Sequence, residues 1–555
     1  MKKVIIRFLT ILFGIALTFA IVACVPDNSN STNTNIGQNI GNNSSSNNNS
    51  SSEESGNKTN NESFENKETF ENATEGLQYY PLSNDSYAVS VGTACYLKEI
   101  TIPSKYNGKA VTAIVNSGFY ASAMETIIIP DSITDLGHYS FENCESLKNI
   151  IIPNQVTYIG NSLFSGCTNL KAVVLPQSVS TINTYAFSGC TALENIIIPA
   201  KVNYIGDSAF TQCTSLKNIT LPDNLEYIGY GAFYKCNIES VTIPQKVSFI
   251  GNKAFSYCNN LHTVNWKATN VADLSSNELY FYECNNLKYL NIGQDIARIP
   301  YRAFYKLSSI QKIVLPDSVE EIGGYAFFEC KAIESIQFGK NLKTVGMYAF
   351  HGTNINSLSL QNKVLSIGQS AFSNCSNLSS VYLPTRIKEI GSAAFSGCLT
   401  LSEITIPNGL TTIEDLLFSG CSSLIRVKIP DTVTEIQYDA FSGCESLENI
   451  ELPNTISNIG RNAFRNCKKL KTISLPTSLS KLDLGLFEGC ETLQYIVIDL
   501  NISEIAWNSF SGCYSLVIYT KQPSKPLGWY NNWNAGRPVY WLGSWKYVNN
   551  IPCPL

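Results

Sequence analysis

The fold is decided by the stretch Val156-Thr-Tyr-Ile-Gly-Asn-Ser-Leu-Phe164-Ser-Gly-Cys167-Thr-Asn-Leu170-Lys-Ala-Val-Val-Leu-Pro176, because the chain then repeats it over residues 179–199 and 202–222. Copies aligned on the phenylalanine fall at Phe119, Phe141, Phe164, Phe187, Phe210, Phe233, Phe255, Phe281, Phe304, Phe327, Phe350, Phe372, Phe395, Phe418, Phe441, Phe464, Phe487 and Phe510. These 18 anchors are separated by 17 steps over 391 residues, so the mean period is 23. Self-similarity at such a period is the sequence signature of a solenoid.

Each copy contains two short extended pieces and a turn. Residues 147–153 alternate isoleucine with an intervening position, as a strand does, and proline closes the piece because it donates no ladder hydrogen bond. Residues 156–160 form a second extended piece that ends in glycine, and residues 162–167 are expected to form a helical or 3₁₀ turn. Stacking places each apolar slot about 4.8 Å from its copy. We therefore expect about 18 rungs of parallel strands around one core.

The pattern IPxxVxxIGxxAFxxCxxL, which covers about residues 97–516, resembles the BspA-like leucine-rich repeats, also called the TpLRR type. The opening stretch 100–114 is similar to that family's first repeat, with an Asn107-Gly108 turn inserted. The resemblance implies a curved, right-handed leucine-rich-repeat solenoid in a surface protein of bacteria or protists that is implicated in adhesion. It implies no ligand and no catalytic residue.

The chain has 18 cysteines, and 15 of them share one repeat slot: 144, 167, 190, 213, 236, 258, 284, 330, 375, 398, 421, 444, 467, 490 and 513. Leu307 and Thr353 fill the same slot in two other repeats, so the slot accepts a small or apolar side chain. No CxxC pair exists, which argues against zinc or iron–sulfur ligation, and parallel side-chain directions are poor disulfide geometry. We predict buried free thiols and no cofactor; disulfides are the alternative.

The N-terminus predicts export and tethering. Residues 1–23 combine a positive start with an apolar run that is short for a membrane span, and Ile21-Val22-Ala23-Cys24 resembles a bacterial lipobox. We expect a lipoprotein signal peptide, lipidation of Cys24 and a membrane-anchored protein at the cell surface; an uncleaved signal anchor or an ordinary signal peptide is the alternative. Residues 24–76 are rich in Asn and Ser and predict a disordered stalk.

Composition argues against several classes of function. The formal net charge is -5 with no basic stripe, so no nucleic-acid partner is expected. The three histidines lie in different repeats, which argues against a histidine-based catalytic or zinc centre. Residues 519–555 contain no Asp or Glu, and the nearby pair Asp273 and Glu278 is better explained as a solvated surface. We therefore predict that the chain is not an enzyme.

Departures from the repeat define the remaining domains. The step from Phe255 to Phe281 spans 26 residues and carries an insertion, whereas three other steps span 22. We expect the solenoid with its N-terminal cap to cover residues 77–518. The Trp-rich residues 519–555 are expected to form a C-terminal cap, with a small ligand-binding appendage as the alternative.

Two surfaces are candidates for binding. The first is an aromatic cluster in the middle rungs that flanks the Phe anchors: Tyr227, Tyr230, Tyr234, Tyr257, Tyr280, Tyr282, Tyr301, Tyr305, Tyr325, Phe328 and Tyr348. Tyrosine is enriched at protein interfaces, although these rings can also simply pack on one another. The second is an outward-facing apolar stripe on the first strands: Ile128, Ile151, Val174 and Ile197. Exposed apolar patches mark partner sites, although β-branched preference or cover by residues 77–95 also explains this one.

These features favour a non-catalytic surface lipoprotein that presents its solenoid for binding to a macromolecule, above all a protein, on a host or another cell. A carbohydrate-binding or carbohydrate-active surface protein is one alternative hypothesis, and a structural envelope spacer is another. The oligomeric state does not follow from the residues.

Overall fold

The computed structural model describes residues 73–275 and 278–555, and the chain from Thr74 to Leu555 forms one compact unit. The predicted lipidation residue Cys24, the predicted signal peptide and nearly all of the predicted stalk lie outside the described residues. Among the residues that are described, no helix is long and apolar enough to cross a membrane.

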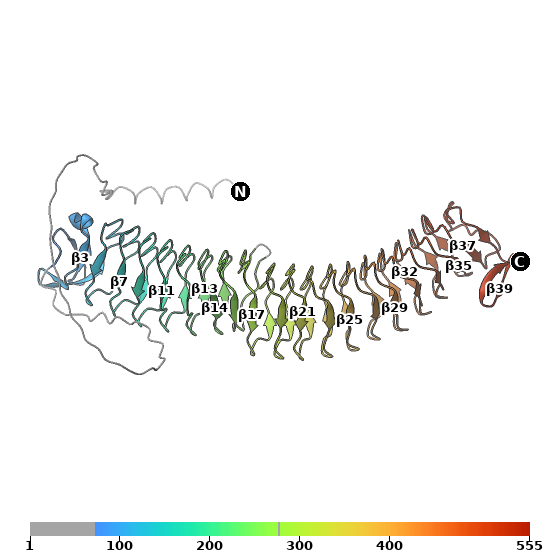
Figure 1. The fold of residues 1–555 in the computed structure, drawn as a ribbon, viewed down its shortest axis with the longest axis horizontal. Helices are drawn as coiled ribbons and strands as arrows, with labels where there is room; N and C mark the ends of the chain where they lie inside the picture. The colour runs from blue at the N-terminus through green and yellow to red at the C-terminus, as the bar shows by residue number, and fades with distance from the viewer. Residues whose placement is uncertain (1–72, 276–277) are drawn as a thin grey trace, which may run out of the picture. The chain divides into compact units, whose positions relative to one another are not determined.

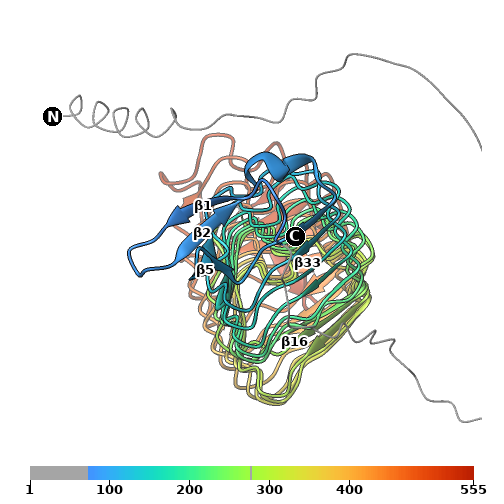
Figure 2. The same cartoon turned by 90° about the vertical axis from the view of Figure 1, so that its left-hand side faces the viewer.

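The compact unit is a parallel β-solenoid with two series of strands. In Figure 1 the turns lie side by side in chain order, and in Figure 2 they overlie one another around a common core. The first series contains the strand that follows each Leu: β3 (Glu99–Thr101), β6 (Thr126–Ile128), β7 (Asn149–Ile151), β9 (Ala172–Val174), β11 (Asn195–Ile196), β14 (Ser240–Ile243), β16 (Thr263–Trp266), β17 (Tyr289–Ile292), β19 (Lys312–Val314), β21 (Ser335–Gln337), β23 (Ser357–Ser359), β25 (Ser380–Tyr382), β27 (Glu403–Thr405), β29 (Arg426–Lys428), β31 (Asn449–Ile450), β33 (Thr472–Ile473), β35 (Tyr495–Ile498), β37 (Val517–Thr520) and β38 (Val539–Tyr540). The second series contains the strand that ends at the Gly slot: β8 (Tyr158–Ile159), β10 (Thr181–Ile182), β12 (Tyr204–Ile205), β13 (Tyr227–Ile228), β15 (Phe249–Ile250), β18 (Arg298–Ile299), β20 (Glu321–Ile322), β22 (Thr344–Val345), β24 (Ser366–Ile367), β26 (Glu389–Ile390), β28 (Thr412–Ile413), β30 (Glu435–Ile436), β32 (Asn458–Ile459), β34 (Lys481–Leu482) and β36 (Glu504–Ile505).

The Phe segment forms the third side of each turn. Its backbone closes through bonds from residue i to residue i−3, such as the 3.1 Å bond from Cys167 N to Phe164 O, but it is not a continuous helix. Left-handed residues interrupt it two positions before and two positions after the Phe, as Ser162 (φ 49°) and Gly166 (φ 74°) do around Phe164. The 18 Phe rings form one stack through the core, with centroids of neighbouring rings 5.1 to 6.4 Å apart. The predicted core ladder is therefore confirmed.

The cysteine ladder is also confirmed, since all 15 thiols are free and buried. Each ladder thiol donates a hydrogen bond to the carbonyl oxygen of the Phe one turn earlier, as Cys167 Sγ does to Phe141 O at 3.0 Å. That carbonyl already accepts the N–H of the Cys in its own turn, so the thiol fills its second lone pair. Thr353 instead donates to Phe350 O within its own turn. Burial raises the pKa of Cys144, Cys330 and Cys375 to about 12.

Both ends of the stack are covered. At the N-terminal end, β1 (Gln78–Pro81), β2 (Tyr87–Ser90), β5 (Lys109–Ile114) and β4 (Lys105–Tyr106) form a four-stranded sheet, and the 3₁₀ helix η1 (Gly92–Tyr96) follows β2. At the C-terminal end, Trp529 and Trp533 are buried, and the Trp533 ring contacts Phe510 edge-on at 6.3 Å. The chain ends in the antiparallel hairpin of β39 (Trp545–Val548) and β40 (Ile551–Pro554). The stack of Phe rings thus ends on apolar packing.

The irregular turns have local causes. In the 26-residue step, the fully buried Trp266 occupies an inward slot that Ile243 and Ile292 fill in the neighbouring strands. The extra residues make room for the larger indole ring and for Tyr280, whose centroid lies 6.0 Å from it. In each 22-residue step, one residue is missing after the Cys slot, which holds Ser122, Cys236 or Thr353 in those turns.

Candidate binding surfaces

The apolar stripe faces outward on the first strand series. Ile128, Ile151, Val174 and Ile197 have exposed fractions of 45, 43, 53 and 80%. Ile151 and Val174 are direct neighbours in register between β7 and β9. Their placement follows from the strand period, because the residues on either side of each point into the core. The alternative explanation, cover by residues 77–95, does not hold: β1 pairs with β2 and β2 pairs with β5, whose Ala113 bridges Asp135 beside the second series.

A second surface, which we call the aromatic ridge, runs along the outward slots of the Phe turns in the middle of the solenoid. These slots lie two residues before, one residue after and two residues after each Phe, where the side chain leaves the core. The ridge consists of Tyr234, Tyr257, Tyr282, Arg302, Tyr305, Tyr325, Phe328, Tyr348 and His351. The turns at Phe395, Phe418 and Phe441 carry Ser396, Ser419 and Ser442 one residue after the Phe. The ridge is therefore a local feature of one part of the stack.

In the first half of the ridge, the rings meet edge to face. Tyr257 lies 5.4 Å from Tyr234 and 5.6 Å from Tyr282, with interplanar angles of 74° and 79°. The Lys235 ammonium lies 5.3 Å from the Tyr234 centroid and 6.0 Å from that of Tyr257. Cation–π contacts of this kind hold a lysine close to the rings.

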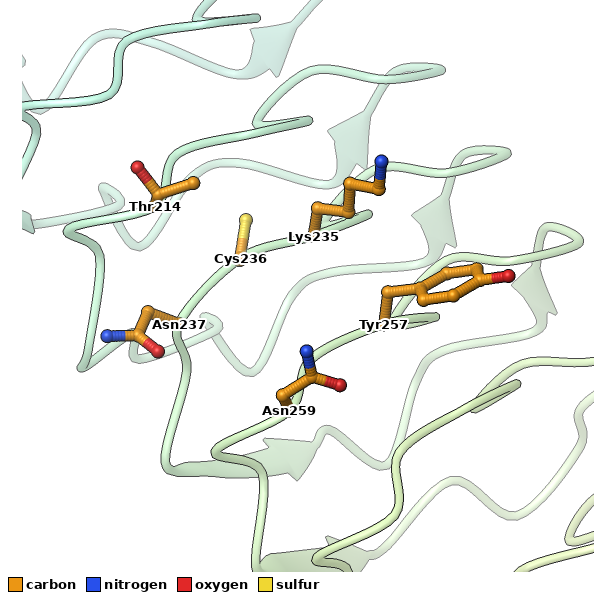
Figure 3. Close-up of a pocket in the computed structure, with 6 residues that line it drawn as sticks. All are labelled: Thr214, Lys235, Cys236, Asn237, Tyr257 and Asn259. Atoms are coloured by element: carbon orange, nitrogen blue, oxygen red, sulfur yellow. The ribbon is translucent and has the colours of Figure 1, made fainter.

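A hollow of about 290 Å³ opens beside this half of the ridge, where the chain is one residue short after Cys236. Figure 3 shows that the side chains lining it come from three neighbouring turns. The lining consists of Thr214, Lys235, Cys236, Asn237, Tyr257 and Asn259. Cys236 itself is 2% exposed and donates to Phe210 O, so the thiol remains a core group.

In the second half of the ridge, the rings stack face to face. Phe328 lies between Tyr305, at 4.9 Å, and His351, at 4.8 Å, with interplanar angles of 4° and 8°. Tyr325 and Tyr348 form a parallel pair at 4.8 Å. Because each ring covers the face of its neighbour, this half presents ring edges and phenol hydroxyls to the surroundings.

Arg302 lies over this stacked half. Its guanidinium carbon is 4.1 Å from the centroid of Tyr305 and 5.8 Å from that of Tyr325. Its Nε–H is buried and has no hydrogen-bond partner among the described residues. By contrast, Lys306 on the same turn is paired with Glu329 at 3.2 Å, and the hydrogen bond from that carboxylate raises the pKa of Lys306.

Several ridge residues hold an unfavourable backbone conformation. Arg302, Tyr325 and Tyr348 have φ of 58°, 57° and 54°, and Tyr257 has φ of 59°. The left-handed region costs an ordinary L-residue about 1–2 kcal/mol. Gly231 and Gly485 fill the slot of Arg302 in other turns without that steric cost. The ridge therefore carries large side chains at positions where the backbone favours glycine.

Burial perturbs two titratable groups of the stacked half of the ridge. Desolvation raises the pKa of Tyr325, and the neighbouring Tyr348 adds to the shift. Desolvation also lowers the pKa of His351, against a smaller opposing effect of Glu329. At neutral pH the stacked half therefore consists of neutral rings with one guanidinium above them.

Four members of the predicted aromatic cluster do not belong to the ridge: Tyr227, Tyr230, Tyr280 and Tyr301. Tyr280 is 1% exposed and donates a hydrogen bond from its hydroxyl to Ala272 O at 3.1 Å, so its inclusion in a binding surface is wrong. Tyr227 lies on the second strand series, stacked at 4.6 Å on both Tyr204 and Phe249. Tyr230 is exposed and contacts Phe249 edge-on.

Sequence reasoning missed Arg302 and His351, which continue the ridge, and it missed Tyr204 and Phe249 on the other face. The signal for Arg302 was its position two residues before Phe304, the slot that Tyr325 and Tyr348 fill in the next two turns. Tyr301, which was included, meets Tyr325 edge-on at 5.6 Å beside the ridge.

A third surface is a broad groove of about 1130 Å³ over strands β25 to β31. Its floor carries outward side chains of mixed charge, including Glu403, Arg426, Lys428 and Glu451, together with Tyr382. The alternation of sign makes it a polar face rather than an anion or cation site.

The carboxylates of the insertion have a structural role. Asp273 accepts hydrogen bonds from Arg298 Nη2 at 2.6 Å and from Tyr301 N at 2.8 Å. Despite burial, the bonds to Arg298 and Tyr301 hold the Asp273 pKa below its usual range. Glu278 accepts from Ser275 N. Across residues 73–275 and 278–555, no group of three or more His, Cys, Asp and Glu side chains could hold a metal ion.

Comparison with known proteins places this geometry in a family. The sequence matches the family described as BspA type leucine rich repeat region, six copies, over residues 90–194, 182–310, 297–425 and 415–525. No curated protein matches the chain.

Solved structures similar to the chain include three bacterial leucine-rich-repeat proteins. One from Bacteroides ovatus is 23% identical, with 82% of this chain and 100% of that chain covered and a TM-score of 0.49. A leucine rich cell surface protein from Faecalibacterium prausnitzii is 28% identical, with 68% and 93% covered and a TM-score of 0.35. The T. pallidum protein TpLRR is 18% identical, with 60% and 91% covered and a TM-score of 0.17.

Proposed function

The chain belongs to the BspA-type leucine-rich-repeat family, and from that premise we propose that it is a non-catalytic, surface-tethered lipoprotein that binds a protein partner and mediates adhesion. Proteins of this family are typically cell-surface proteins and repeat scaffolds. The partner is a macromolecule on a host or neighbouring cell. It engages several turns at once, because a solenoid offers a long face that can supply the roughly 800 Å² per side of a standard protein interface.

The observation that carries this proposal is the aromatic ridge. Its rings extend over several consecutive turns, whereas the turns at Phe395, Phe418 and Phe441 carry serine one residue after the Phe and glycine two residues after it. Tyrosine, phenylalanine and arginine are the residue types enriched at the centres of protein interfaces. The stack of Phe rings below the ridge continues through the later turns, so the fold does not require the aromatic residues of the outward slots.

The test is binding by a triple variant of the ridge. Tyr234→Ser, Tyr282→Ser and Tyr305→Ser together should weaken capture of surface proteins from the neighbouring cell by the full-length chain. The matched control changes Ser396, Ser419 and Ser442 to alanine at the same slot in the later turns. The bound protein is identified by mass spectrometry and its affinity is then measured with purified components.

Two outcomes count against the proposal. Normal binding by the triple variant removes the ridge as the site, and loss of binding together with a collapsed melting temperature makes the tyrosines packing residues. Binding of a neutral glycan panel in place of protein, with the same dependence on the three tyrosines, replaces the protein-binding role with a carbohydrate-binding one.

Tethering is tested separately at Cys24, which lies outside the described residues. The sequence Ile21-Val22-Ala23-Cys24 is the motif that motivates it. In cells fed a labelled fatty acid, the wild-type chain should incorporate the label, and Cys24→Ser should leave an unlabelled, unprocessed precursor. Label retained in the variant refutes the anchor without bearing on the ridge.

A further inference from the structure

Arg302 has the features of a binding residue without its ligand. We propose that Arg302 is the anchor of the aromatic ridge and that it receives a side-chain carboxylate from an acidic segment of a partner protein. The inference deepens the proposed function, on which it rests, by naming the contact and the chemistry of the partner.

Within the described part of the chain, the Arg302 side chain forms no ion pair and no hydrogen bond, and its Nε–H is buried. The nearby Arg298 is fully used, with Asp273 at 2.6 Å and Glu321 at 3.1 Å. Of its guanidinium nitrogens only Nε is buried without a partner, so the two terminal nitrogens are left to donate to an acceptor from outside the chain.

The Tyr305 ring orients the Arg302 guanidinium. The guanidinium lies 4.1 Å from the Tyr305 centroid, and the Tyr305–Phe328–His351 stack fixes that ring from behind. A planar guanidinium held on an aromatic face keeps its N–H groups in one plane, which matches the two oxygens of a carboxylate. Less side-chain entropy is lost on binding because the side chain is already placed.

The fold does not require a large side chain at position 302. Arg302 has φ of 58°, as most residues in this slot of the repeat have a left-handed backbone. Gly231 and Gly485 show that the turn closes in the same way without a side chain. The Arg302 side chain is therefore free to serve contacts outside the core.

The ring geometry favours a protein over a sugar as the occupant. A pyranose ring stacks on exposed aromatic faces, but in this half of the ridge the faces of Tyr305, Phe328 and His351 cover one another. Exposed edges and hydroxyls suit the hydrogen-bonding groups of a polypeptide. Met347, which is 46% exposed and borders Tyr301 across Gly324, adds an adaptable apolar contact typical of protein interfaces.

The experiment measures binding of a fluorescein-labelled oligoglutamate peptide to the full-length chain by fluorescence anisotropy. We expect salt-sensitive binding that Arg302→Gly weakens by about tenfold or more, and that Arg302→Lys restores only in part. The matched control is Arg461→Gln, since Arg461 lies 4.7 Å from the Tyr438 centroid on the later turns; it should change binding by less than about twofold. The melting temperature of Arg302→Gly should stay the same or rise.

Three results overturn the inference. The first is that Arg302→Gly binds the peptide with an affinity within about twofold of wild type. The second is a lower melting temperature in that variant. The third is that a heparin fragment binds in an Arg302-dependent way and with higher affinity than oligoglutamate. Its failure can be told from that of the proposed function. A cell-surface protein captured equally by Arg302→Gly refutes the anchor alone, whereas Arg302-dependent peptide binding without any captured protein refutes the adhesive role alone.

Discussion

Replacing Phe395 with alanine tests whether the ring stack holds the turns together. Its ring is fully buried between Phe372, at 5.8 Å, and Phe418, at 6.0 Å. The neighbouring turns cannot collapse into the space, because backbone bonds such as Phe395 N to Leu417 O at 3.1 Å fix their spacing. A cavity of this kind costs roughly 3–5 kcal/mol. The Cys421 thiol keeps its acceptor, since that is the main-chain oxygen of residue 395.

The loss should be local, because each turn of a solenoid contacts only its neighbours. In hydrogen exchange read by mass spectrometry, amides of residues 372–418 should open on the order of 100- to 5000-fold more often. Amides around Phe141 to Phe187 should not change. Ser396→Ala, beside the same ring but outside the core, is the control and should alter exchange by less than about threefold. If the variant loses less than ~1 kcal/mol of local stability, the ring stack is not what holds the turns together. If stability falls equally along the whole chain, the turns do not depend on their nearest neighbours alone.

Further predictions concern the thiols and two turn positions. Burial raises the pKa of ladder thiols such as Cys421 from 9.0 to about 12. Between these two pH values the unfolded chain releases thiol protons that the folded chain keeps. The stabilisation that the buried thiols contribute is therefore complete below pH 9 and is lost as the pH rises toward 12. Melting temperatures measured from pH 9 to about 12 test this pH dependence. In a separate test, a disulfide reagent at pH 8 should react with the 15 ladder thiols only after the chain is denatured without reductant. Gly251→Ala should lower stability by roughly 1–3 kcal/mol in urea titrations, because its Cβ would lie 2.4 Å from Tyr230 N; an unchanged midpoint contradicts this. Leu416→Gly should raise stability by up to ~1 kcal/mol, because Leu416 has φ of 58°; a loss would mean that its side-chain contacts outweigh the strain.

The fold was predictable because the repeat is nearly strict. The spacing of Phe, Cys, Leu and Ile assigns each slot to the inside or the outside, and neighbouring copies confirm one another. The free thiols followed from Leu307 and Thr353, which no disulfide or metal scheme accommodates. What the spacing could not predict is why cysteine prevails in the slot. The cysteine thiol donates a hydrogen bond to the Phe carbonyl one turn earlier, and this contact can be identified only once the turns are stacked.

The candidate site was predictable in part. A stricter use of the slots would have excluded Tyr280, which directly precedes Phe281 where other turns carry a buried alanine, as at Ala254 and Ala303. Ring orientation was beyond the sequence, because edge-to-face and stacked arrangements arise from the same residue types at the same spacing. The left-handed backbone at Arg302 was equally hidden, since it follows from how the turn closes around the core.

Core and surface are separated slot by slot in this solenoid, and this separation decides where binding specificity can reside. Changes in the inward slots are limited by the ring stack and the thiol ladder, which recur from Phe141 to Phe510. The outward slots of the Phe turns carry no such limit, as the contrast between Tyr305 and Ser396 shows. The slots two residues before and two residues after each Phe carry the left-handed backbone, which favours glycine. A large side chain in such a slot, as at Arg302, is not required by the fold and is therefore free to serve contacts outside it.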